Sequence, residues 1–100
     1  MFDVEFPETV EKAVERLKQI LSKEDIEYIR SMKEEEEVIS MHMTLGNWIR
    51  NSFGLWSMNG PLRNSCFPDG PKDPRSENIE PDDCSHEILK ALWRDLQTKQ

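Results

Sequence analysis

The stretch PDDCSHEILKALWRDL, residues 81–96, decides the fold class of this 100-residue chain. Apolar side chains recur in it at helical spacing, at positions 84, 88, 89, 92, 93 and 96, with polar residues between them. Pro81 suits the first turn of a helix, and the helix dipole favours the carboxylates of Asp82 and Asp83 there. The stretch therefore predicts an amphipathic last helix with one face packed on a core.

Three earlier segments show the same periodicity. Thr9 is a suitable N-cap for a helix that continues to about residue 21, and Ser22 opens a second, short helix. A third helix is expected from about residue 34 to residue 51, ending before Gly54. Since no stretch of useful length alternates with period two, the sequence predicts an all-α fold, a compact bundle of about four helices.

The segment between the third and last helices has the composition of a loop. Residues 66–80 contain three prolines separated by Asp, Lys, Ser and Asn, so we expect a long, Pro-rich, mobile loop. The length of the chain fits a single helical domain spanning residues 1–100. The residues expected in its core are Leu17, Ile29, Leu45, Trp48, Ile49, Phe53, Trp56, Leu89 and Trp93.

Charge and cysteine content limit the partners of the protein. Twenty acidic against 13 basic residues give a net charge of −7, which argues against direct nucleic-acid binding. The N-terminal MFDVEFPETV lacks the basic and apolar regions of a secretory signal, and no apolar run reaches membrane-spanning length. We therefore expect a cytoplasmic protein without membrane contact, with Cys66 and Cys84 reduced, and neither metal nor cofactor bound.

The segment HMTLGNWIRNSFGLWSMN, residues 42–59, is richer in polar residues than core packing requires. His42, Gly46 and Arg50 are spaced i, i+4 and i+8 and so form one line along a helix. One interpretation is structural: a buried neutral histidine, a close helix contact at the glycine, and an ion pair from the arginine to Asp82 or Asp83. The other is a binding site. Its candidate residues are His42, Gly46, Arg50, Asn51, Trp56, Asn59, Asp82 and Asp83.

No nucleophile beside a base, paired acids around a cleft or phosphate loop is visible, so the sequence gives no sign of an enzyme. We expect a small acidic binding protein that acts on a protein partner, as an inhibitor, an immunity-like protein or a regulatory factor. The alternative is a receptor or sequestering protein for a small anionic ligand such as a nucleotide. Arg50, His42 and the neighbouring asparagines would then hold the anion.

The order of these motifs resembles a family of small uncharacterised bacterial and phage proteins, described only as a domain of unknown function. The resemblance covers nearly the whole chain and is most specific in HxxxGxxxRNxxGLWxxN, starting at His42, and in PDDxS, starting at Pro81. The present chain has Glu80 where members of that family carry a histidine. The resemblance implies a helical fold and draws attention to the same residues, but it implies no activity.

Overall fold

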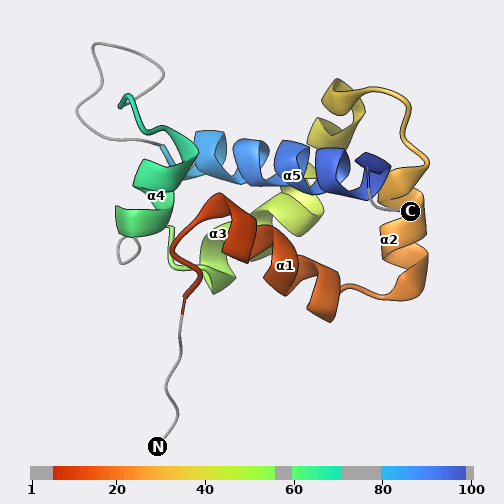
Figure 1. Cartoon of the computed structure of the whole chain (residues 1–100), viewed down its shortest axis with the longest axis horizontal. Helices are drawn as coiled ribbons and strands as arrows, with labels where there is room; N and C mark the ends of the chain where they lie inside the picture. Colours follow the sequence, from red (N-terminus) through yellow and green to blue (C-terminus); the bar gives the residue numbers. More distant parts are fainter. Residues whose placement is uncertain (1–5, 56–59, 71–79, 99–100) are drawn as a thin grey trace, which may run out of the picture.

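The computed structural model describes residues 6–55, 60–70 and 80–98, and all its regular elements are helical. The described residues contain five α-helices, labelled in Figure 1, and, between α2 and α3, a 3₁₀ and a π segment. This confirms the predicted all-α class. The elements are α1 (Val10–Ile20), α2 (Lys23–Arg30), η1 (Glu35–Met41, 3₁₀), η2 (His42–Gly46, π), α3 (Asn47–Ser52), α4 (Gly60–Cys66) and α5 (Pro81–Thr98).

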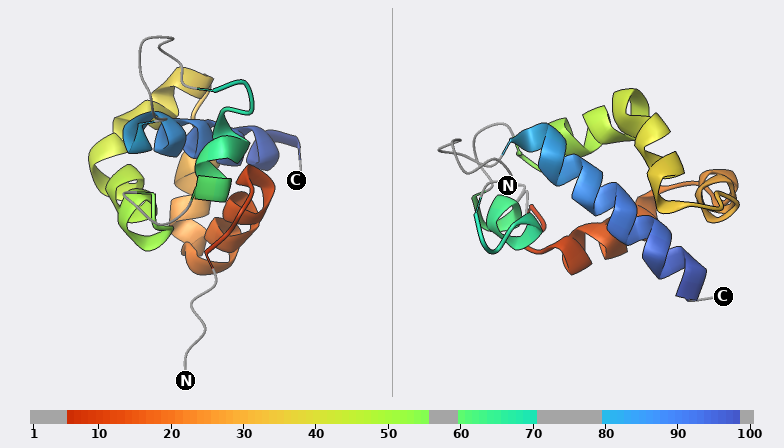
Figure 2. Two further views of the ribbon diagram at one scale, coloured as in Figure 1. Left: turned by 90° about the vertical axis from the view of Figure 1, so that its left-hand side faces the viewer. Right: turned by 90° about the horizontal axis from the view of Figure 1, so that it is seen from above.

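Helix α5 is the centre of the molecule and contacts every other element. Viewed from above, it crosses diagonally with α1 on one side and the η1–η2–α3 segment on the other (Figure 2). Its buried stripe matches the periodicity of the sequence. The stripe consists of Cys84, Ile88, Leu89, Leu92 and Leu96, each at most 3% exposed.

The helix ends follow the capping residues in the sequence. Thr9 Oγ1 accepts from the backbone N–H of Lys12 at 3.1 Å, and Ser22 Oγ accepts from that of Asp25 at 3.1 Å. Gly54, just past α3, has a φ of 70°, a left-handed conformation that favours glycine. A Cβ at this position would also lie 3.1 Å from the Phe6 ring. The three predicted helix boundaries are confirmed.

The segment from 35 to 52 is not the single α-helix that the sequence predicts. It starts as 3₁₀, widens to a π turn over His42–Gly46 and becomes α-helical from Asn47. Met41, with φ −89° and ψ 10°, leaves the helical region at the junction. Its carbonyl oxygen accepts a hydrogen bond from Thr44 Oγ1 at 3.2 Å, a side-chain competitor to regular helix bonding.

This change of helix type explains one wrong core prediction. Trp48 is 38% exposed, because the wider π turn rotates it off the arc that a regular helix would bury. Leu45 and Trp93 are partly buried, and Trp56 lies outside the described residues. The other predicted core residues are buried, namely Leu17, Ile29, Ile49, Phe53 and Leu89.

The expectation that the cysteines stay reduced is also wrong. Cys66 and Cys84 form a disulfide, with Cα atoms 5.5 Å apart. The expectation assumed a reducing compartment, whereas helix packing decides whether two cysteines meet. Helix α4 carries Cys66 against the first turn of α5, and the resulting Cα separation suits a disulfide.

Helix α4 also shortens the predicted loop at residues 66–80, because Cys66 is its last residue. Pro68 and Asp69 are exposed, as expected of that loop, and residues 71–79 lie outside the described part.

Candidate functional site

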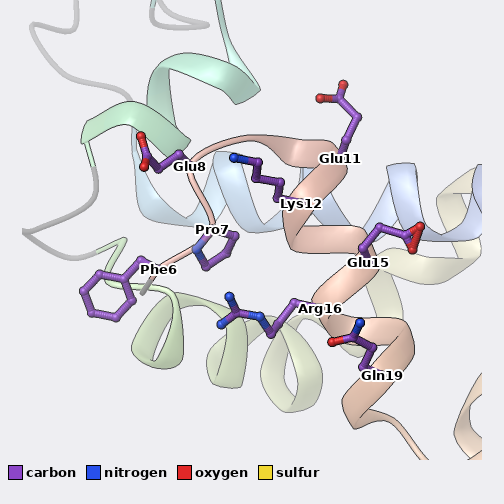
Figure 3. Close-up of a pocket in the computed structure, with 8 residues that line it drawn as sticks. All are labelled: Phe6, Pro7, Glu8, Glu11, Lys12, Glu15, Arg16 and Gln19. Carbon is purple, nitrogen blue, oxygen red and sulfur yellow. The ribbon is translucent and has the colours of Figure 1, made fainter. Parts of the chain in front are cut away.

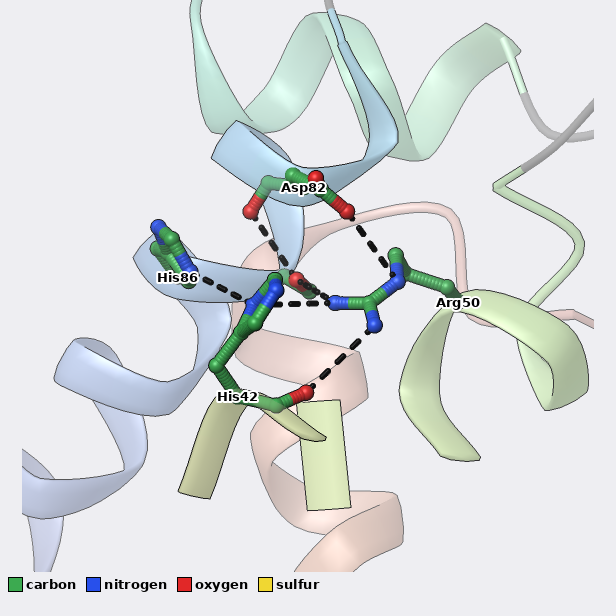
Figure 4. A network of polar contacts seen from close by, with 5 residues as sticks. His42, Arg50, Asp82 and His86 are labelled. Atoms are coloured by element: carbon green, nitrogen blue, oxygen red, sulfur yellow. Dashed lines mark hydrogen bonds and ion pairs between the residues drawn. The ribbon is translucent and has the colours of Figure 1, made fainter. Parts of the chain in front are cut away.

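Five side chains form a polar network where η2 and α3 meet the first turns of α5 (Figure 4). Since η2 and α3 both contact α5, the network joins two segments that lie far apart in the sequence. Its members are His42 from η2, Arg50 from α3, and Asp82, Ser85 and His86 from α5.

Arg50 is the central cation of the network and is only 5% exposed. Its Nη1 donates to Ser85 Oγ at 3.0 Å, and this hydroxyl donates to the backbone carbonyl of Asp82 at 2.9 Å. Its Nη2 donates to the carbonyl oxygen of His42 at 3.4 Å. Its Nε lies 3.3 Å from Oδ1 of Asp82, an ion pair without hydrogen-bond alignment. The predicted pairing of Arg50 with the start of the last helix is confirmed for Asp82.

The two histidines are in direct contact. Nε2 of His86 lies 2.8 Å from Nδ1 of His42, and Nη1 of Arg50 approaches the same Nδ1 at 3.3 Å. Because a guanidinium only donates, Nδ1 of His42 is the acceptor, and His86 donates to it from Nε2. Burial, and after it His42, lower the pKa of His86 below the usual 6.5, although Asp82 and Asp83 act in the opposite direction.

Gly46 makes room for this arrangement. A Cβ there would lie 3.3 Å from Nη1 of Arg50, 3.5 Å from the carbonyl oxygen of Met41 and 3.7 Å from Cδ1 of Leu89. The space that a side chain would fill is therefore occupied by the guanidinium. The close contact expected at this glycine is present, and it involves both the Arg50 side chain and Leu89 of α5.

The network includes only some of the predicted candidates. It brings together His42, Arg50 and Asp82, and Gly46 lies beside the Arg50 guanidinium. Asn51 is exposed on α3, Asp83 lines a hollow beside η1, and Trp56 and Asn59 lie outside the described residues. Ser85 and His86 were not among the predicted site residues, although Ser85 is the last residue of the PDDxS motif. Their spacing from Asp82, i+3 and i+4, places all three on one face of a helix and was a usable signal.

An apolar groove of about 370 Å³ opens on the other side of the η2–α3 segment, facing α1 and α2. Ile20 and Trp48 at this groove are 51% and 38% exposed, so large apolar side chains face solvent there. Its lining consists of six apolar residues, Leu17, Ile20, Leu21, Met41, Leu45 and Trp48, together with Asp25 and Thr44. We call this feature the apolar groove.

Another hollow, of about 550 Å³, lies along the outer face of α1 (Figure 3). Its charged side chains do not converge: Glu11 and Glu15 point away from Lys12 and Arg16. A binding site needs polar groups directed at one point, so this hollow is a weaker candidate than the apolar groove despite its volume.

A third hollow, of about 270 Å³, lies between η1 and α5 and is lined by His86, Asp83, Glu36 and neighbouring side chains. Across residues 6–55, 60–70 and 80–98, no three His, Cys, Asp or Glu side chains are placed to share a metal ion. No helix within these same ranges is long and apolar enough to cross a membrane.

Comparison with known proteins identifies a family without identifying a function. No curated protein and no solved structure matches the chain significantly. Residues 6–96, which include α1 to α4, the polar network, the apolar groove and most of α5, match one family throughout. The chain belongs to the family described as the domain of unknown function DUF6794.

Proposed function

We propose that this protein is a small acidic, non-enzymatic binding protein that acts on a protein partner through the apolar groove. The observation that carries the proposal is the exposure of Ile20 and Trp48 at a groove lined almost wholly by apolar side chains. Contiguous exposed apolar surface rimmed by polar groups is typical of interaction sites. Tryptophan is also among the residues that contribute most to protein interfaces.

The charge of the groove favours one kind of partner segment. Asp25 is the only charged residue in the lining, and no hydrogen bond or ion pair of its carboxylate occurs among the described residues. The whole chain carries a net charge of −7. The expected occupant is therefore a protein segment that places a large apolar side chain in the groove and a lysine or arginine beside Asp25.

The alternative function, a receptor for a small anionic ligand, has less support. It assigns the anion to Arg50 and His42, but the Arg50 guanidinium is buried and already contacts Asp82, Ser85 and His42. An entering anion would have to displace the carboxylate of Asp82. We therefore expect nucleotides and phosphorylated metabolites to leave the melting temperature unchanged.

Within the proposed class, an inhibitor, an immunity-like protein and a regulatory factor would all use such a surface. The bacterial or phage origin and the cytoplasmic location stay predictions. The Cys66–Cys84 disulfide weighs against the cytoplasm, because disulfides persist mainly in oxidising compartments. Alkylation of free thiols in fractionated source cells, followed by mass spectrometry, would measure the redox state of both cysteines in place.

The proposal is tested by selecting peptides from a random displayed library on the wild-type protein. Each round includes depletion on the double variant Ile20→Ser, Trp48→Ala, which removes the two exposed apolar side chains of the groove. The enriched peptides should combine a large apolar residue with a neighbouring lysine or arginine. A matched control is Tyr28→Ser, since Tyr28 is 58% exposed and lies outside the groove lining.

The outcomes of this selection distinguish between the possible occupants of the apolar groove. Peptides that bind wild type and Tyr28→Ser, but not the double variant, support the proposal. Peptides that bind all three proteins equally would refute the groove as the site. Trp48-dependent dimerisation in sedimentation experiments would instead identify a second copy of this chain as the occupant, and would overturn the proposal of a different partner.

A further inference from the structure

The η2–α3 segment borders the apolar groove and also carries part of the polar network. The inference drawn from this arrangement rests on the function proposed above. Leu45 and Trp48 of this segment, together with Met41 at the end of η1, form one wall of the apolar groove. His42 and Arg50, on the same segment, hold it against α5 through the polar network. A change in the network therefore acts on the wall of the groove.

The network depends on one lone pair. Nδ1 of His42 accepts from Nε2 of His86 at 2.8 Å and faces Nη1 of Arg50 at 3.3 Å. A proton added to this Nδ1 would turn the shared acceptor into a donor facing two other donors. The neutral pair is thus compatible with the observed contacts, whereas the protonated His42 is not.

Charged groups of both signs lie around His86, and the net effect of its surroundings is to lower its pKa. Burial is the largest effect that lowers the pKa of His86, and the neighbouring His42 and Arg50 act in the same direction, while the carboxylates of Asp82 and Asp83 oppose them. Two of the acids facing His86 already have cationic partners: Glu35 pairs with Arg94, and Glu87 pairs with Lys90. The charged residues lining the hollow beside His86 are Glu35 and Glu36 from η1 and Asp83, Glu87 and Lys90 from α5.

Helix type adds to the sensitivity of this contact. The η2 turn is a π-helix, a geometry common at functional sites. Only five residues long, it is flanked by the 3₁₀ turns of η1 and the six-residue α3. Val38 of η1 and Ile49 of α3 are fully buried, so the two neighbours are held by apolar packing, whereas the η2 turn between them is held mainly by its polar contacts.

We propose that the His42–His86 contact makes the apolar groove sensitive to pH. With both imidazoles neutral, the η2–α3 segment is held on α5 and the groove binds its partner. At mildly acid pH the contact breaks, the η2 turn shifts on α5, and the partner is released. The device is a proton-controlled release of a bound protein segment.

The test uses a double variant that keeps the contact but does not titrate. In His42→Asn, Oδ1 replaces the acceptor Nδ1, and in His86→Gln the side-chain amide replaces the donor Nε2. The probe is a peptide without histidine taken from the selection above. Its affinity for wild type should fall about tenfold between about pH 7.5 and about pH 5.5. Its affinity for the double variant should stay constant.

Two further measurements keep the outcomes distinct. Hydrogen exchange of residues 41–50, corrected for the intrinsic effect of pH, should increase at acid pH in wild type only. Asp25→Asn controls for titration of the groove carboxylate, and His86→Gln alone serves if the double variant fails to fold. A peptide that binds with equal affinity at both pH values refutes this inference and leaves the proposed function standing. If hydrogen exchange increases at acid pH but the selection yields no peptide that binds through the groove, the proposed function is refuted instead.

Discussion

Arg50 stands out among the individual residues because a buried guanidinium holds three other residues in place. Replacing it by methionine removes its hydrogen bonds to the fully buried Ser85 and to the carbonyl oxygen of His42. We expect Arg50→Met to lower the free energy of unfolding by about 1–3 kcal/mol. The loss stays below the cost of an orphaned buried charge, because Asp82 is exposed to water.

Urea denaturation measures this change, and Arg94→Met is a matched control. Arg94 also pairs with a carboxylate, that of Glu35, but its side chain is 55% exposed. Its replacement should cost no more than about 0.5 kcal/mol. Equal effects of the two substitutions would show that Arg50 is not the structural centre of the network.

Gly46 offers a second prediction at this scale. Alanine gains about 1 kcal/mol of helix propensity over glycine, but its Cβ would press on a guanidinium that three partners hold in place. We expect Gly46→Ala to destabilise the fold by about 1 kcal/mol. In an Arg50→Met background the same substitution should become neutral or stabilising, as a double-mutant cycle would measure.

Residue spacing predicted three of the five side chains of the network, those of His42, Arg50 and Asp82. The i, i+4, i+8 line of His42, Gly46 and Arg50 was visible, as was the partnership with the start of the last helix. Ser85 and His86 were missed, because a network across two helices depends on which faces meet, and the tertiary packing decides that. The exposure of Trp48 was missed for a related reason, since a π turn leaves no mark in apolar periodicity.

Among the elements, α4 depends most on a covalent link. It is seven residues long, too short to be stable alone, and its disulfide to α5 spans 18 residues. Closing a loop of this length restricts the unfolded chain and stabilises the fold by about 3 kcal/mol. We expect reduction to lower the free energy of unfolding by that amount.

Urea titrations with and without a reducing agent check this without changing any side-chain volume. A Cys66→Ser, Cys84→Ser variant should not respond to the reductant. If the wild type were equally indifferent, the link would contribute nothing to stability under those conditions.

Helix α5 is fixed near its C-terminal end by Trp93, whose Nε1 donates to the carbonyl oxygen of Met32 at 2.8 Å. The ring is only partly buried, so Trp93→Ala should cost about 2–3 kcal/mol, less than a fully buried tryptophan. Trp93→Phe keeps most of the packing and should cost about 1 kcal/mol for the hydrogen bond. Thermal unfolding followed by far-UV circular dichroism separates the two variants. A larger loss in the phenylalanine variant would contradict this assignment.

For the whole molecule, stability should depend on pH through His86. The pKa of His86 is lower in the folded protein than its ordinary value of 6.5. Just below pH 6.5 the unfolded chain therefore binds more protons than the folded one. The contribution of His86 is present in full above about pH 6.5 and is lost as the pH falls below it. The free energy of unfolding should therefore decrease from about pH 7 to about pH 5.5, and less steeply in His86→Gln. Stability that rises on acidification in this window would contradict the sign.

Fold class and core follow from the sequence at this scale, because one strongly periodic helix needs the apolar faces of its neighbours. The stripe from Cys84 to Leu96 is buried, and Leu17, Ile29 and Ile49 complete it from three other elements. The apolar groove could not be predicted in the same way. Its walls, such as Ile20 and Trp48, come from helices whose relative placement no local pattern records.

The Cys66–Cys84 disulfide also determines how the protein responds to tension. When the chain is pulled from its ends, force passes from residue 66 to residue 84 through the sulfur atoms, and the residues between them stay slack. An extended chain spans roughly 3.4 Å per residue, so this segment hides about 60 Å of contour length. After subtraction of the 5.5 Å between the two Cα atoms, the reduced, unfolded chain should be longer than the oxidised one by about 55 Å. An optical trap resolves that difference as a discrete lengthening when a reductant enters the chamber.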